Sequence, residues 1–69
     1  MDSAELLRRL KRIAKQRGVP YAFDPRPGKG SHGRVTLGTH FTTVPTHGDI
    51  GKGLLHAILR DLGLNRDDL

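Results

Sequence analysis

The sequence predicts a small α+β domain in which two helices cover one face of a three-stranded antiparallel sheet, in the order α-β-β-β-α. Three observations predict it. An amphipathic pattern with the helical period stands at each end of the chain, three short strand-like runs lie between, and turn-forming residues separate these runs. Placing both apolar helix faces on the same side of the sheet buries them most economically. The chain has 69 residues, a length that supports one domain, residues 1–69.

The first helix is expected over residues 4–17. Asp2 or Ser3 can cap its start, whereas Gly18 and Pro20 end it. Basic residues cover the arc opposite its apolar stripe. We expect most of this arc to be solvated, with some attraction for RNA or an acidic partner. The apolar stripe consists of Leu6, Leu7, Leu10, Ile13 and Ala14.

Three strands are expected in the middle of the chain, and Pro45 ends the last of them. Gly38-Thr39 fits a two-residue hairpin turn of type II′. A three-residue turn would instead bring Phe41 to the buried face, so the register stays open. The expected strands are residues 21–23, 34–37 and 40–44. The two-residue turn would place Val35, Leu37, Thr42 and Val44 on one face.

The second helix is expected over residues 52–62. Gly63 followed by Leu64 is typical of a helix that ends in a Schellman motif. Asp49 is expected to cap the start of this helix. Residues 66–69 are expected to form a frayed tail. The apolar stripe of the helix consists of Leu55, Ile58, Leu59 and Leu62.

Composition narrows the classes of function. The chain has no cysteine, which excludes disulfides, cysteine-based metal sites and a thiol nucleophile. It has no apolar run near the roughly 20 residues that a membrane span needs, and its charged N-terminal region lacks the core of a signal peptide. We therefore expect a cytoplasmic domain without membrane contact. The net charge of +5 favours anionic partners, with nucleic acid first among them.

A glycine-rich segment precedes the second strand. Glycines let a backbone approach a phosphate closely, and successive N–H groups can form an anion-binding nest. Gly30 separates Lys29 from Ser31, so the segment is not a Walker P-loop. Composition alone favours a simpler interpretation, a hairpin connector with a solvated histidine. The segment reads Gly28-Lys29-Gly30-Ser31-His32-Gly33-Arg34.

His32 is the candidate catalytic residue, because histidine exchanges protons at neutral pH. Cleavage of RNA through its own 2′-OH needs a base, an acid and stabilisation of a charged phosphorane. His47 is a secondary candidate for proton transfer. The histidines are too far apart in the sequence for metal-ligand spacing, so we expect no metal. Lys52 can reach a phosphate held by the second helix's N-terminus.

These residues resemble the HicA family of bacterial toxins, from the first helix to Leu64. The GSH motif alone is unspecific, but the three motifs in this order and spacing are quite specific. The motifs are Lys29-Gly30-Ser31-His32, then Thr42-Thr43-Val44-Pro45 with His47-Gly48, and then the run from Lys52 to Leu64.

The resemblance implies a fold similar to the double-stranded-RNA-binding domain and a ribonuclease that cuts mRNA without a cofactor. It also implies a HicB antitoxin as partner, which we expect to cover His32. The family's essential histidine maps onto His32, whereas the family pattern gives no secure second catalytic group. Five residues are expected to bind RNA phosphates: Lys29, Gly30, Ser31, Arg34 and Lys52.

Two features depart from the family pattern. Many members have a second histidine or a bulky residue after the motif histidine, where this chain has Gly33, and the stretch from Gly18 to Gly30 is longer than in the shortest members. Two other functions also fit the charge and the order of elements. One is a non-catalytic RNA-binding module, and the other is a basic subunit that assembles with an acidic protein. His32 favours the enzyme, because a pure binder has no need of it.

Overall fold

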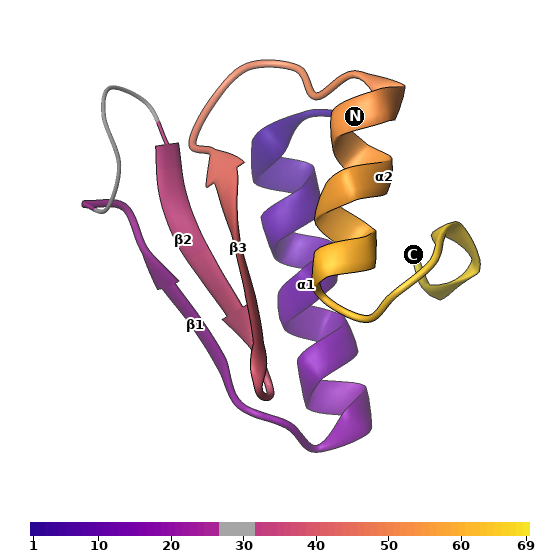
Figure 1. The fold of residues 1–69 in the computed structure, drawn as a ribbon. Coiled ribbons are helices and arrows are strands. Elements are labelled where there is room, and N and C mark those ends of the chain that lie inside the picture. Colours follow the sequence, from indigo (N-terminus) through magenta and orange to yellow (C-terminus); the bar gives the residue numbers. More distant parts are fainter. Residues whose placement is uncertain (27–31) are drawn as a thin grey trace.

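The computed structural model describes residues 1–26 and 32–69. It confirms the predicted α-β-β-β-α order (Figure 1). The second strand begins two residues earlier than expected, at His32, and the third includes Pro45. The elements are α1 (Ser3–Arg17), β1 (Tyr21–Asp24), β2 (His32–Leu37), β3 (His40–Pro45), α2 (Lys52–Asp61) and the 3₁₀ helix η1 (Arg66–Asp68).

Both ends of α1 follow from local capping. The Ala4 N–H donates to Asp2 Oδ2 at 3.1 Å, so Asp2 is the N-cap. Gly18 has a φ of 69°, a left-handed conformation that glycine adopts without steric cost, and it ends the helix. The predicted apolar stripe is buried except for Leu7, which is half-buried. α1 therefore turns a continuous apolar face toward the core.

The sheet has the strand order β1-β2-β3 and is antiparallel throughout. Leu37 pairs with His40, so the turn between β2 and β3 has two residues. Gly38 has a φ of 64° and Thr39 has no positive φ, the pattern of a type II′ turn. The structure thus selects the first of the two registers. Val35, Leu37, Thr42 and Val44 are buried on one face, and Phe41 lies on the other.

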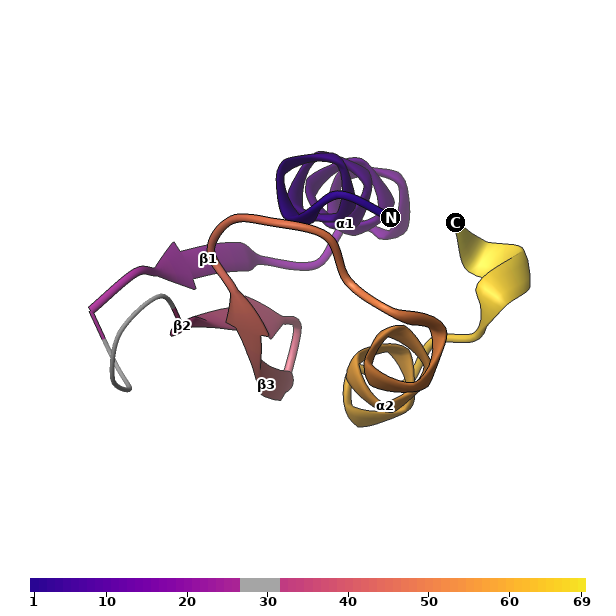
Figure 2. The same cartoon turned by 90° about the horizontal axis from the view of Figure 1, so that it is seen from above.

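Both helices pack on this buried face (Figures 1 and 2). The opposite face, which we call the outer face of the sheet, is not covered by either helix (Figure 2). Among the described residues, no helix has the length and hydrophobicity that a membrane span requires. The residues that are buried most completely come from α1, both longer strands and α2: Leu6, Leu10, Val35, Val44, Ile58, Leu59 and Leu62.

The C-terminal end of α2 confirms the predicted Schellman motif. The Leu64 N–H donates to the Leu59 carbonyl at 2.8 Å, and the Gly63 N–H donates to the Arg60 carbonyl at 3.1 Å. Gly63 has the required positive φ of 74°.

The last residues differ from the expected frayed tail. Residues 66–68 form η1, which Asn65 and Asp68 close with a capping box. The Arg17 guanidinium pairs with Asp68 at 2.9 Å, and Leu69 packs against the core. The local capping box and these long-range contacts together order the segment.

Candidate functional site

His32 is the first residue of β2, and its side chain is exposed. Its neighbour Gly33 is buried on the helix-covered face, so the alternation along the strand places His32 on the outer face, together with Arg34. His32 is paired with Pro45 of β3. The imidazole makes no hydrogen bond or ion pair with another residue of the described part of the chain.

Gly33 explains how the start of β2 is packed. A Cβ at this position would lie 2.8 Å from the Asp24 carbonyl oxygen and 2.9 Å from two carbons of the Phe23 ring. The absence of a side chain therefore lets Phe23 and the end of β1 close tightly over β2. A side chain at this position would need β1 or the Phe23 ring to move.

The segment after β3 carries His47, and the N-terminal residues hold it in place. The Ser3 N–H donates to the Gly48 carbonyl at 2.9 Å, and the Ile50 N–H donates to the Met1 carbonyl at 2.7 Å. His47 is exposed, and its Nδ1 lies 3.1 Å from Thr46 Oγ1. Because Pro45 is opposite His32, His47 lies only two residues beyond the partner of His32.

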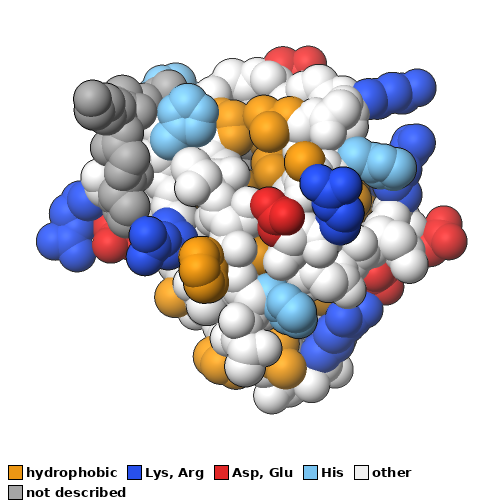
Figure 3. Space-filling view, viewed as in Figure 1, with side chains coloured by type: hydrophobic (Ala, Val, Ile, Leu, Met, Phe, Trp, Pro, Cys, Tyr) orange, Lys and Arg blue, Asp and Glu red, His pale blue; other side chains and the backbone are white. Residues whose placement is uncertain are grey.

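A bound on the separation of the two histidines follows from the register. Paired Cα atoms in an antiparallel sheet are at most about 5.5 Å apart, and two further residues span at most about 7 Å. The Cα atoms of His32 and His47 are therefore within about 13 Å of each other, a distance that two side chains facing one phosphate can bridge. Histidine side chains gather at this end of the sheet in Figure 3.

Arg34 also lies on the outer face, where it pairs with Thr43. Its guanidinium carbon is 5.5 Å from the centroid of the Phe41 ring, a cation–π contact. Asp24 pairs with Arg34 across β1 and β2. Hydrogen bonds from the Arg26 backbone and side chain, with the charges of Arg26 and Arg34, hold the pKa of Asp24 below its usual range. This carboxylate therefore remains charged at neutral pH beside the basic residues.

Lys52 is the first residue of α2, which starts at the same end of the molecule as β2 (Figure 1). It lines a hollow of about 240 Å³ together with His56 and Arg66. No acidic residue lines this hollow. Sequence reasoning missed Arg66, because it treated the segment as a tail. The structure brings Arg66 to Lys52 because the chain after α2 folds back.

Asp49 is not the cap of α2, so that expectation was wrong. The N-cap is Gly51, which has no side chain, and no side-chain hydrogen bond caps the helix. Asp49 instead pairs with the amino group of Met1 at 3.1 Å. The first N–H groups of α2 are thus left without a carboxylate, which keeps the end of the helix attractive to an anion.

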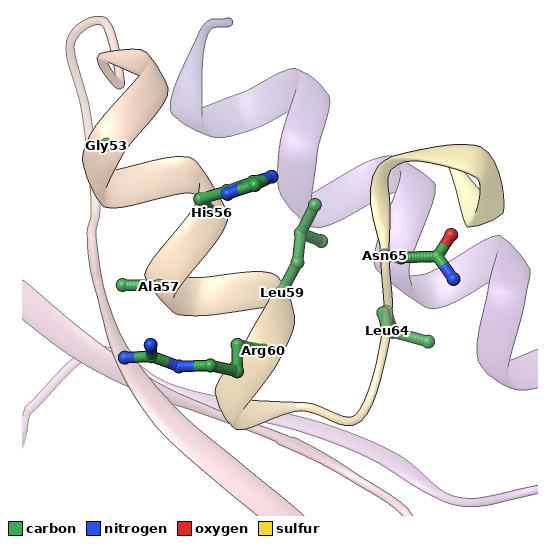
Figure 4. A pocket seen from close by; sticks show the side chains of 7 residues that line it. All are labelled: Gly53, His56, Ala57, Leu59, Arg60, Leu64 and Asn65. Atoms are coloured by element: carbon green, nitrogen blue, oxygen red, sulfur yellow. The ribbon is translucent and has the colours of Figure 1, made fainter.

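A second hollow of about 380 Å³ lies along α2. Figure 4 shows His56 and Leu59 on the side of the helix that faces Leu64 and Asn65, with Arg60 on the other side. Of the predicted site residues that the structure describes, His32, Arg34 and Lys52 do not line this hollow. It is a surface groove between α2 and the returning chain, and it is separate from the end of the sheet that carries His32.

Three predicted phosphate-binding residues, Lys29, Gly30 and Ser31, lie outside the described residues. Of the others, His32 and Arg34 share the outer face of β2, whereas Lys52 belongs to α2. Within residues 1–26 and 32–69, no group of three or more histidines and carboxylates is placed to hold a metal ion.

Comparisons with known proteins agree with the motifs. A curated relative from Pseudomonas fluorescens (strain Pf0-1), named "Probable mRNA interferase HicA", is 39% identical over 57 residues, which cover 80% of this chain and 88% of the relative. No solved structure matches the chain significantly. Residues 21–64 match the sequence model of the family described as "HicA toxin of bacterial toxin-antitoxin". This match spans all three strands and α2, and with the similar relative it shows that the chain belongs to the HicA toxin family.

Proposed function

We propose that this chain is an endoribonuclease that cuts mRNA, and that it is the toxin of a toxin–antitoxin pair. Membership of the HicA family supports the toxin role, and the name of the Pseudomonas fluorescens relative supports mRNA as the substrate. The basic character of the chain, with twelve Lys and Arg against seven Asp and Glu, suits a polyanionic substrate.

The position of His32 carries the proposal. The side chain is exposed at the start of β2, where the backbone of His32 is paired with Pro45 of β3, so a strand end held by the sheet presents the imidazole to solvent. Its ring nitrogens are not used by any other described group. An imidazole held in this way can serve as a general acid or base.

The reaction we propose uses the RNA's own 2′-OH. A base removes the 2′-OH proton, the oxygen attacks the adjacent phosphorus, and a new O–P bond forms as the bond to the 5′-oxygen breaks. An acid protonates the departing 5′-oxygen. The products are a 2′,3′-cyclic phosphate and a 5′-OH, so protons and charge balance without a cofactor.

We assign the two proton transfers to His32 and His47. The bound of about 13 Å between their Cα atoms allows the two rings to approach opposite sides of one phosphate. Thr46 Oγ1, 3.1 Å from Nδ1 of His47, orients that ring, which leaves Nε2 for the substrate. The hydrogen bonds from the Ser3 N–H to the Gly48 carbonyl and from the Ile50 N–H to the Met1 carbonyl tie the segment after β3 to the N-terminal residues and restrict its movement.

Positive charge around the histidines would hold the phosphates. Arg34 is next to His32 on the outer face, and Lys52 lies at the uncapped start of α2. Lys29, Gly30 and Ser31 precede His32 directly in the sequence and are assigned to the scissile phosphate. A HicB-type antitoxin would neutralise the toxin by covering His32 and placing acidic groups against these basic residues.

The test is cleavage of RNA by the purified chain in excess EDTA. We compare the parent with His32→Ala and with His40→Ala as a matched control. His40 is opposite Leu37, five residues along β2 from His32, so it lies about 16 Å from the site. We expect the parent and His40→Ala to leave cyclic phosphate ends and His32→Ala to leave the RNA intact. Equal cleavage by His32→Ala would remove His32 from the mechanism.

A further inference from the structure

Phe41 is the most exposed large hydrophobic side chain that the structure describes. It is 62% exposed, on β3, and it points away from the core. An isolated exposed hydrophobic residue needs no explanation in general. This one lies on the edge strand β3, next to the residue pair that closes the hairpin, where a smaller or polar residue would fill the same position with less exposed apolar area.

The neighbours of Phe41 indicate a binding role for its ring. The Arg34 guanidinium lies over the ring, 5.5 Å from its centroid, although Arg34 has open solvent on the same face. Figure 3 shows a basic side chain next to an exposed hydrophobic one on the sheet side of the molecule. Flat aromatic rings and guanidinium planes are the groups on which proteins stack unpaired RNA bases.

The same face also carries His32. Arg34 is two residues along β2 from His32, about 7 Å away, and Phe41 is opposite Thr36, about 13 Å from His32 along the strand. A strand of RNA whose phosphate is at His32 would therefore run past Arg34 and bring a flanking base to the Phe41 ring. No helix covers this path (Figure 2).

We propose that Phe41 and Arg34 form a stacking platform for an unpaired base of single-stranded RNA, next to the phosphate that is cut. The proposal rests on the proposed ribonuclease function and names its substrate class. A base in a duplex is already stacked and paired, so only an unpaired base can lie flat on the ring. The positive charge of Arg34 meets the RNA backbone on the same face, which favours RNA over an apolar protein segment.

Binding is measured separately from cleavage, so that the two proposals can fail independently. The probe is a fluorescent single-stranded RNA with 2′-O-methyl groups, which cannot be cut through the 2′-OH, and the readout is anisotropy. The variants are Phe41→Ala, Phe41→Leu and Phe41→Tyr. The matched control is Leu54→Ala, because Leu54 is the other exposed large hydrophobic residue, 46% exposed on α2.

We expect Phe41→Ala to weaken binding about five- to a hundredfold, the range for losing one stacked base. Phe41→Tyr keeps a ring and should bind like the parent, whereas Phe41→Leu keeps apolar area without a ring and should bind like Phe41→Ala. Leu54→Ala should bind like the parent. A duplex RNA of the same length should show no difference between the parent and Phe41→Ala.

Three results would overturn the platform. They are unchanged binding by Phe41→Ala, equal binding by Phe41→Leu and the parent, and no measurable binding of single-stranded RNA by the parent. The first would leave this face to another occupant, such as a protein partner. A His32→Ala variant that still cuts RNA, with Phe41→Ala binding weakly, would refute the catalytic proposal and leave the platform standing.

Discussion

Gly33→Ala is a substitution by one methyl group that we expect to destabilise the protein. An ideal Cβ at this position lies 2.8 Å from the Asp24 carbonyl oxygen and 2.9 Å from Cε1 and Cζ of Phe23. The ring of Phe23 can tilt, but the carbonyl belongs to the backbone of β1. Asp24 pairs with Arg34 in the ladder, so β1 can retreat only by stretching its hydrogen bonds to β2.

The magnitude follows from two opposing contributions. Inserting an extra carbon into a packed site costs about 1–3 kcal/mol. Replacing glycine by alanine also restricts the unfolded chain, which stabilises the protein by about 0.4–1 kcal/mol. The midpoints of these ranges, about 2 and 0.7 kcal/mol, leave a net loss of about 1.3 kcal/mol. In a domain of this size each kcal/mol shifts Tm by about 4–8 °C, so we expect Tm to fall by about 5–10 °C.

Thermal and urea unfolding followed by circular dichroism would measure this loss. The matched control is Gly53→Ala in α2, where a Cβ meets nothing within 4 Å. Because alanine is a better helix former than glycine, the control should gain up to about 1 kcal/mol. Opposite shifts of the two variants are the expected result. A Tm for Gly33→Ala at or above that of the parent, with the control shifted upward, would refute the packing argument.

Three further predictions concern other sites. Ser3→Ala should raise the free energy of unfolding by about 1 kcal/mol, because the Ser3 hydroxyl is buried without a hydrogen-bond partner among the described residues. Urea unfolding would measure the change. A lower free energy of unfolding for the variant would mean that the hydroxyl does make a hydrogen bond in the parent. Asp24→Asn should tighten RNA binding at neutral pH, because the lowered pKa keeps the Asp24 carboxylate charged beside Arg34. The difference in affinity between the variant and the parent should vanish only when the pH falls through that lowered pKa, where the parent carboxylate becomes neutral. Anisotropy titrations at several pH values would measure the two affinities. His47→Ala should lower the rate of RNA cleavage and remove one limb of its pH profile, and an unchanged bell-shaped profile would exclude His47 from proton transfer.

The features that the sequence predicts well are those with local causes. The N-cap Asp2, the left-handed Gly18 and the Schellman ending at Gly63 and Leu64 each depend on a few neighbouring residues, and the structure confirms all of them. The expected frayed tail was wrong for the opposite reason. Besides the local capping box of Asn65 and Asp68, its order depends on the contact between Arg17 and Asp68, which are far apart in the sequence.

In the candidate site, too, features with local causes could be predicted and features that depend on long-range contacts could not. His32 can be found from its motif alone, and the structure places it, exposed, at the start of β2. The contact of Arg34 with Phe41 could not be predicted, because it depends on the hairpin register. A turn with one more residue would have moved Phe41 into the core. Likewise, Arg66 joins Lys52 only because the chain returns along α2.

The placement of both helices on one face of the sheet has a consequence for function. Both helices use their apolar faces on the same side of the sheet, so neither of them covers the outer face (Figure 2). An open face costs stability, but the ladder stiffens it, because residues 34–37 of β2 pair with both neighbouring strands and His32 and Gly33 pair with β3. His32, Arg34 and Phe41 occupy this rigid, open surface rather than a cavity. A long, flexible RNA can reach such a surface without a lid or a domain movement, and a protein partner that covers the same surface would block it completely.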